Sequence, residues 1–203
     1  MKRLLLVAIA LLFSTAAEAR APLMYGYGLN LGTMLVPGQY PTVFPKQIRQ
    51  NDDSEIEKVW QDVHLGLEGL IYATPTHRFA ASGALGFGKN FRDRYFLLKY
   101  ARVVNWEAGE IIVGGGAGVG RSVYRTDGKE ELSTPYYPLR AEIGPMFRYD
   151  FMAFQPQLYG QYNMTWAHFY TNPEGEEEDV GTGLYGMIGI ELNFYLGEFR
   201  TPG

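Results

Sequence analysis

Apolar residues alternate with small or polar residues along most of this chain, and no other feature constrains its fold as strongly. From Leu23 to Val36, large residues such as Tyr25, Leu29 and Leu31 occupy every second position, and glycine dominates the positions between them. A β-strand repeats its faces every two residues, whereas an α-helix repeats them every 3.6 residues. This segment is therefore predicted to be a strand with one apolar face.

The same alternation recurs seven more times. Strands are expected at residues 23–36, 59–73, 78–89, 95–104, 110–124, 136–149, 152–166 and 180–197. The fourth is the least regular, because Leu97 and Val103 fall on its polar side. Most of these segments are far longer than the average globular strand of about five or six residues. The sequence therefore predicts an all-β fold of eight long antiparallel strands.

The connections between these strands also alternate in length. Long polar links follow the first, fifth and seventh strands, at Pro37–Lys58, Thr126–Pro135 and Ala167–Asp179. Short links follow the others, at residues 74–77, 90–94, 105–109 and around Asp150. Long and short links at opposite ends are typical of an up-and-down barrel.

The N-terminus has the order of a secretory signal peptide. Two basic residues, Lys2 and Arg3, precede the apolar run Leu4–Phe13, and Ala17-Glu18-Ala19 has the A-x-A form of a cleavage site. Ten apolar residues are too few to span a bilayer as a helix. We expect a signal peptide over residues 1–19 and one barrel domain over residues 20–203.

Composition excludes several classes of protein. The 203 residues include no cysteine, which excludes a disulfide framework and cysteine-ligated zinc. The net charge of −4 argues against nucleic acid as a partner, because such proteins need a basic surface. A mean hydropathy of −0.16 excludes a protein with several transmembrane helices.

The polar side of the alternation carries glycine and charges of both signs. Its charged and polar members are Asp62, His64, Glu68, Lys99, Arg140, Glu142, Arg148 and Glu191. Near-cancellation of charge suits a narrow interior of low dielectric, where an unpaired charge is costly. Glycines 114, 116, 118 and 120 are expected to make room there for Arg and Glu side chains from other strands. The predicted barrel therefore faces lipid with its apolar side and encloses a polar lumen; a soluble lipid-binding barrel would reverse both faces.

Two further patterns support a membrane barrel. Aromatic residues gather near the predicted strand ends, at Tyr25, Tyr27, Trp106, Tyr137, Tyr149, Trp166 and Phe194, as in interfacial girdles. The segment Met187–Phe194 resembles the C-terminal strand signal that the outer-membrane assembly machinery reads. The chain as a whole resembles the small eight-stranded outer-membrane β-barrels, which include the OmpA transmembrane domain and OmpX-like proteins. The resemblance implies a location in the outer membrane of a Gram-negative bacterium and contact with outer-membrane lipid and lipopolysaccharide.

Three prolines conflict with a continuous ladder. Pro138 and Pro145 fall in the sixth predicted strand and Pro156 in the seventh. Proline cannot donate a hydrogen bond to a neighbouring strand and is found at edges, ends or bulges. We expect a bulge or a strand end at each of these positions, with Pro138 and Pro156 near strand ends.

The sequence contains no convincing catalytic, metal or cofactor site. Outer-membrane lipid A deacylases carry a His-x-Ser pair on a late strand, but Tyr170 stands two residues after His168 here. The glycine run at residues 114–120 has no following helix, so no dinucleotide cofactor is expected. An acidic run holds Glu174, Glu176, Glu177, Glu178 and Asp179. It is expected to be a solvated surface loop, with binding of divalent cations as the alternative.

These observations favour a structural, anchoring or surface-interaction protein that acts through its loops and has envelope proteins as partners. A narrow, porin-like pore for small solutes is the alternative, because glycine leaves space in the lumen. A lipid A-modifying enzyme is a more remote one.

Overall fold

The structure is a computed structural model that describes residues 24–35, 62–88, 91–106, 109–125, 131–167, 169–171, 175–179 and 183–199. The predicted signal peptide, the link Pro37–Lys58 and His168 lie outside the described residues. Within these ranges, no helix is long and apolar enough to cross a membrane.

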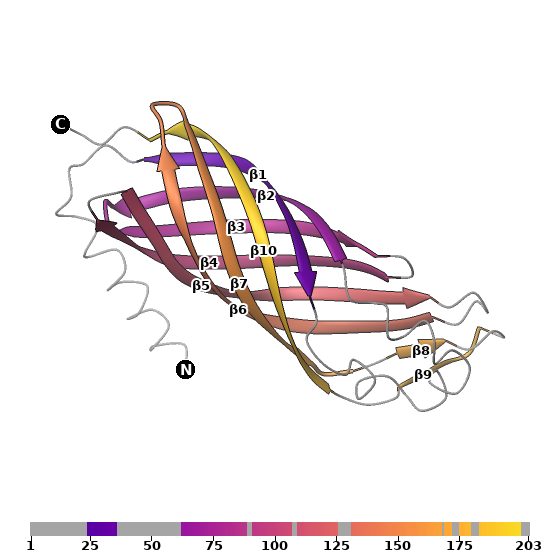
Figure 1. The fold of residues 1–203 in the computed structure, drawn as a ribbon. Coiled ribbons are helices and arrows are strands. Elements are labelled where there is room, and N and C mark those ends of the chain that lie inside the picture. Colours follow the sequence, from indigo (N-terminus) through magenta and orange to yellow (C-terminus); the bar gives the residue numbers. More distant parts are fainter. Residues whose placement is uncertain are drawn as a thin grey trace.

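Eight long strands form a closed antiparallel barrel (Figure 1). They are β1 (Tyr25–Leu35), β2 (Asp62–Thr74), β3 (His77–Phe87), β4 (Phe91–Trp106), β5 (Gly109–Arg125), β6 (Glu131–Arg148), β7 (Met152–Thr165) and β10 (Gly183–Glu198). Strands β1 to β6 each pair with the next strand along the chain, and β10 closes the barrel by pairing with both β7 and β1. This closure confirms the predicted eight-stranded antiparallel up-and-down barrel.

The two ends of the barrel differ in their connections. Residues 75–76, 107–108 and 149–151 connect β2 to β3, β4 to β5 and β6 to β7. We call this end the turn end; it also holds Tyr25 and Glu198, the paired outer residues of β1 and β10. Strands β1, β3, β5 and β7 end at the opposite end of the barrel, which we call the loop end.

The outer surface of the barrel is apolar. Leu67 and Leu98, in the middle of β2 and β4, are 67% and 61% exposed, and their neighbours two residues away point the same way. The alternate residues of the same strands, including Glu68 and Lys99, are buried in the interior. This arrangement is the reverse of a soluble barrel, in which the apolar face would be buried. Leu97 and Val103 also point inward, so β4 keeps its alternation and places apolar side chains inside the barrel at these two positions.

Two strands begin earlier than predicted. Residues 91–94 belong to β4 rather than to a link, and residues 131–135 belong to β6 rather than to the loop Thr126–Pro135. Their residues Arg92, Arg94 and Ser133 are polar, which is why the hydrophobic pattern breaks there. These extensions carry the sheet beyond the band of apolar alternation at the loop end.

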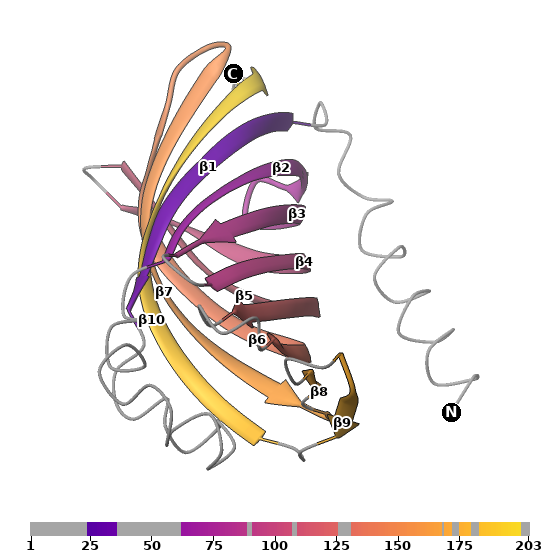
Figure 2. The same ribbon diagram turned by 90° about the vertical axis from the view of Figure 1, so that its right-hand side faces the viewer.

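The link between β7 and β10 also contains strands. Strand β8 (Phe169–Thr171) pairs with the first residues of β6, and β9 (Glu177–Asp179) pairs with β8. Both lie beyond the barrel, at the end opposite the β6–β7 turn (Figures 1 and 2). The expectation of a simple loop at Ala167–Asp179 was therefore wrong. Strand β6 starts beyond the end of β7, and β8 pairs with the edge of β6 that β7 leaves open.

The expectation of bulges or strand ends at the prolines was also wrong. Pro138 and Pro145 lie inside β6, and Pro156 is the fifth residue of β7. The β6–β7 ladder is interrupted between the pairs Ile143–Leu158 and Phe147–Phe154, but its register is the same on both sides of the gap. Continuing that register places Pro145 opposite Pro156, so one gap accommodates both missing N–H donors.

The interior is layered along the barrel axis. At the turn end it holds an apolar cluster of Met24, Leu70, Tyr72, Ala80, Ala101, Val103, Ile112, Met146, Ala153, Tyr195 and Phe199. Phe199 follows the last residue of β10 and is buried in this cluster, beneath Gly26. Charged residues fill the middle of the lumen, and Tyr95, Leu97 and Tyr136 lie toward the loop end. An eight-stranded barrel is just wide enough for its side chains to fill.

Candidate functional site

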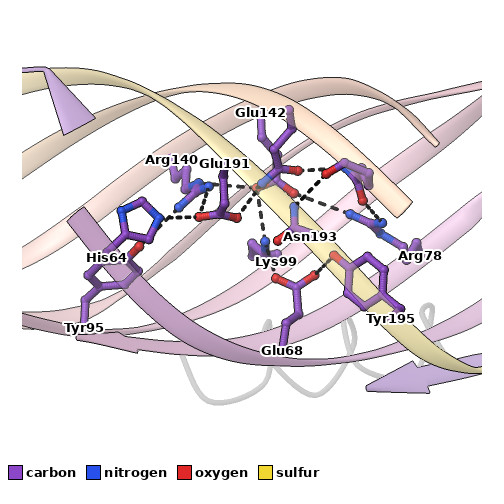
Figure 3. Close-up of polar contacts among 12 residues, drawn as sticks. His64, Glu68, Arg78, Tyr95, Lys99, Arg140, Glu142, Glu191, Asn193 and Tyr195 are labelled. Atoms are coloured by element: carbon purple, nitrogen blue, oxygen red, sulfur yellow. Dashed lines mark hydrogen bonds and ion pairs between the residues drawn. The ribbon is translucent and has the colours of Figure 1, made fainter. Parts of the chain in front are cut away.

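A chain of ionic contacts crosses the middle of the lumen (Figure 3). The ammonium group of Lys99 on β4 contacts Glu68 Oε2 on β2, and it lies 3.2 Å from Glu142 Oε2 on β6. Strands β2 and β6 are four strands apart in an eight-stranded barrel, so they form opposite walls. Lys99 therefore bridges carboxylates from the two sides, and all three side chains are buried.

A second group of contacts involves the last strand. Arg140 on β6 lies 2.9 Å (Nη2 to Oε2) from Glu191 on β10 and 3.3 Å (Nε to Oε2) from Glu142. His64 Nε2 on β2 lies 2.8 Å from Glu191 Oε2. The guanidinium carbon of Arg140 also stands 3.8 Å from the ring centre of Tyr159. Glu142 contacts both Lys99 and Arg140, so the two groups form one network.

Arg78 on β3 is a third cation of this network and was not predicted. Its Nη2 lies 3.5 Å from Glu142 Oε1, and its Nη1 donates a 2.6 Å hydrogen bond to Gln155 Oε1 on β7. With Arg78 included, three acidic side chains (Glu68, Glu142 and Glu191) face three basic ones (Arg78, Lys99 and Arg140). The formal charges cancel, as a buried ionic cluster requires.

Neutral polar side chains add hydrogen bonds to the carboxylates and between the neighbouring strands β7 and β10. The Tyr195 hydroxyl donates to Glu68 Oε1 at 2.8 Å. Gln157 Nε2 donates to Glu191 Oε1 at 2.7 Å and to Glu142 Oε2 at 3.3 Å. Asn193 Nδ2 donates to the backbone carbonyl of Gln155 at 3.3 Å. Hydrogen bonds of this kind are what allow charges to remain buried.

A separate polar contact lies nearer the loop end. Asp93 on β4 accepts hydrogen bonds from the Tyr136 hydroxyl at 2.8 Å and from Ser122 Oγ at 3.1 Å. The Tyr136 ring lies over Gly120 of β5, where a Cβ atom would collide with it. Gly116 likewise leaves room for the Lys99 side chain, whose Cγ would be 2.8 Å from a Cβ. The inward glycines make room for neighbouring Lys99 and Tyr136 and for close backbone approach, rather than for the predicted Arg and Glu side chains.

Six of the eight predicted lumen residues meet in the central network: His64, Glu68, Lys99, Arg140, Glu142 and Glu191. Arg148 does not join them. It lies at the turn end and forms an ion pair with Glu110 of β5. Asp62 is the first residue of β2, and its side chain lies outside the described part of the structure.

The acidic run at residues 174–179 lies partly in a strand and partly outside it. Glu176 and Glu177 are exposed, while Glu177, Glu178 and Asp179 form β9, which corrects the expectation of a loop. Glu174 lies outside the described residues. Among the side chains that are described, no group of three or more His, Asp or Glu residues could hold a metal ion.

Two interior residues were missed for different reasons. Arg78 stands on the inward parity of its strand, next to outward Phe79, so the alternation itself was enough to find it. Asp93 was assigned to a link because β4 was predicted to begin at residue 95. Asp93 points into the lumen because β4 begins at Phe91, so that residue 93 belongs to the strand.

No protein-family model matches this sequence, and none of the curated proteins matches it. Among solved structures, a triple mutant of the Rhodopseudomonas blastica porin aligns over 87% of this chain and 99% of its own, with 7% identity and a TM-score of 0.15. Another mutant of the same porin covers the same shares with 8% identity and a TM-score of 0.14. Scores this low do not indicate a common fold.

Proposed function

We propose that this chain is an integral outer-membrane barrel that is closed to solutes and has a structural, anchoring or surface-interaction role. The observation that carries the proposal is the inverted polarity of the barrel. Its outer surface is apolar over the middle of every long strand, and the central ionic network is buried inside. Burying charge while exposing leucine is unfavourable in water and favourable in a bilayer, so this arrangement supports a membrane location.

Aromatic residues at both ends of the outer surface also support it. Tyr25, Tyr27 and Tyr149 are exposed at the turn end. At the loop end the rings of Tyr137 and Trp166 are in contact, with their centres 4.4 Å apart and their planes tilted by 33°. Amphipathic rings in these positions are typical of the girdles of membrane barrels.

The contents of the lumen argue against the pore alternative. The Glu68–Lys99–Glu142 contacts join opposite walls, and the apolar cluster around Phe199 fills the turn end. A hydrated ion would have to displace both layers. The parts of the molecule left to interact with partners are its outer surface and the loop end, where β8 and β9 extend the sheet.

Membrane fractionation tests the location. We expect the expressed protein in the outer-membrane fraction, with faster migration of unboiled than of boiled protein in detergent gels. Recovery in the soluble periplasmic fraction would contradict the proposal and favour a soluble lipid-binding barrel.

Conductance across a planar bilayer tests whether the lumen is closed. We expect no stable current steps from the purified, heat-modifiable protein in neutral salt. Regular steps that persist in independent preparations would replace the closed barrel with the narrow pore, while leaving the membrane location intact.

A further inference from the structure

Two arginines face each other on the outer surface of the barrel. Arg94 of β4 is the direct register partner of Arg121 of β5, and both side chains are exposed. Directly opposed residues have Cβ atoms about 4.5–5.5 Å apart, and like charges in such pairs are destabilising. Arg92 points the same way, two residues nearer the loop end. Three positive charges therefore share one small area of an otherwise apolar surface.

No carboxylate of the described part of the structure balances these charges. None of its ion pairs involves Arg92, Arg94 or Arg121. Of the described acidic side chains at this end, Asp93 points into the lumen, where Tyr136 and Ser122 donate hydrogen bonds to it. Glu176 and Glu177 belong to β9 and the residue before it, three strands away from β5. Three strand spacings correspond to about 14 Å. The cluster is complementary to an external anion.

Local contacts hold two of the three guanidinium groups against the barrel surface. Arg121 Nε donates a 2.7 Å hydrogen bond to Ser133 Oγ on β6. The guanidinium carbon of Arg92 lies 5.2 Å from the ring centre of Phe87 on β3. These contacts draw Arg92 toward β3 and Arg121 toward β6, so the two guanidinium groups are held on opposite sides of Arg94.

An apolar groove begins at the same arginines. It has a volume of about 770 Å³ and is bordered by Arg94 and Arg121. Its apolar lining includes Leu29, Leu65, Leu67, Leu85, Phe96 and Val119. Gly83 lies between the larger residues, and a Cβ atom there would find its nearest neighbour, the Tyr95 carbonyl oxygen, at 3.9 Å. The missing side chain leaves a hollow that a hydrocarbon chain can fill.

The position of the cluster along β4 corresponds to the lipid head groups. The outward residues between Arg94 and Arg102 are Phe96, Leu98 and Tyr100, so two arginines bound an apolar interval. Eight residues of a strand tilted by about 40° rise roughly 20 Å, close to the apolar band of about 25 Å in membrane barrels. Arg94 thus stands at the loop-end edge of that band, and the groove extends from it toward the turn end.

We propose that this groove binds a membrane lipid with a phosphate head group. The phosphate lies between Arg94 and Arg121 within reach of Arg92, and an acyl chain lies over Gly83. Arginine suits this ligand because its planar donors match phosphate oxygens in pairs, and the bound anion removes the repulsion between the two guanidinium groups. The inference rests on the proposed membrane location and adds to it a ligand class and a site.

The test measures lipid retention by the full chain, purified in an uncharged detergent, using native mass spectrometry. The probes are palmitoyl-oleoyl phosphatidylglycerol, the matched diacylglycerol and inorganic phosphate. We expect the parent protein to retain phosphatidylglycerol at least about tenfold better than diacylglycerol, since a hydrogen bond to a charged group contributes about 1.5–3 kcal/mol. The R94Q/R121Q variant should lose at least about tenfold of this retention by the same reasoning.

Two further variants distinguish binding at this groove from nonspecific attraction of the lipid to surface charge. Arg102→Gln removes an exposed arginine of the same strand at the opposite edge of the apolar band, and it should leave retention unchanged. Gly83→Leu keeps every arginine but fills the hollow, and it should weaken retention of the lipid. An equal loss in R102Q, or full retention in G83L, would overturn the proposed site.

The remaining outcomes are also informative. If inorganic phosphate displaces the lipid at equal concentration, the site recognises a free anion and the lipid assignment is wrong. If a heat-modifiable parent barrel retains no phosphatidylglycerol, this inference fails while the membrane location stands. If the parent protein is recovered as a soluble protein, the proposed function fails first.

Discussion

At the scale of single residues, Lys99 is expected to have a large effect on stability. Its ammonium group is the shared partner of Glu68 and Glu142, and all three side chains are buried. Lys99→Met keeps the approximate length of the side chain but removes the positive charge that the carboxylates of Glu68 and Glu142 share. Removing one partner of a buried ion pair costs about 3–5 kcal/mol. Urea-dependent unfolding in phospholipid vesicles measures this loss of unfolding free energy.

A matched double variant separates charge from packing. In K99M/E68Q one carboxylate is neutralised together with the cation, so part of the lost stability should return. An unfolding midpoint of K99M equal to that of the parent protein would contradict the ionic interpretation of the lumen. So would a double variant that is less stable than K99M, because neutralising Glu68 would then lower the unfolding free energy further instead of restoring part of it.

Two glycines on opposite faces of the sheet provide a second comparison. Gly120 points into the lumen beneath the ring of Tyr136, whereas Gly160 of β7 points outward, and a Cβ atom added there would have no neighbour within 4 Å. Gly120→Ala should cost about 1–3 kcal/mol, because it displaces a ring whose hydroxyl satisfies buried Asp93. Gly160→Ala should be neutral or stabilising by about 0.5–1 kcal/mol. Equal unfolding midpoints for the two variants would show that the Tyr136 ring can move at no cost.

At the scale of strands, the alternation predicted each barrel strand but not where β4 and β6 begin. The periodic signal depends on apolar residues facing outward. It ends at Arg94 and Pro135, although the backbone continues as strand to Phe91 and Glu131. Strands β8 and β9, of three residues each, are too short to show a period. Strand β8 pairs with the free edge of β6, and β9 pairs with β8. Strand limits beyond the band of apolar alternation are set by pairing, which a single sequence does not display.

The facing prolines of β6 and β7 give a prediction at this scale. Pro145 and Pro156 both lack the N–H group that a ladder requires, and the β6–β7 pairing is interrupted where they meet. Replacing both by valine restores two donors on one step of the ladder without changing its register. Each hydrogen bond contributes about 0.5–1.5 kcal/mol, so P145V/P156V should be more stable by about 1–3 kcal/mol.

Urea unfolding of P145V/P156V beside the parent protein measures the gain. Amide hydrogen exchange at positions 145 and 156 of the variant adds a local readout, because proline gives the parent no amide proton there. An unchanged unfolding midpoint together with rapid exchange at both positions contradicts the prediction, since the new donors would then have found no acceptor across the ladder.

At the scale of the whole molecule, the sequence predicted which residues face inward but not which of them touch. Parity placed Glu68, Lys99 and Glu191 on one side of the sheet before any pairing was known. The contact between His64 and Glu191 joins residues 127 positions apart and depends on how β10 closes against β1 and β7. Closure fixes the stagger of all eight strands together, so the network is a property of the barrel rather than of any segment.

The outer surface gives the prediction that tests the whole arrangement. Leu98 lies midway between Arg94 and Arg102 on β4, whereas Val104 lies beyond Arg102 at the turn end, and both are exposed. In a bilayer, Leu98→Arg should cost about 2–4 kcal/mol and Val104→Arg only about 0–1 kcal/mol, because the cost of a lipid-facing charge falls toward the interface. In water, both changes would stay within about 0.5 kcal/mol, as for other surface substitutions. Urea titration of folding into vesicles, followed by the heat-modifiable band, measures both variants side by side. Equal small costs would mean that the leucine-rich surface does not face hydrocarbon, and the depth-dependent difference is the result that a membrane-spanning barrel requires.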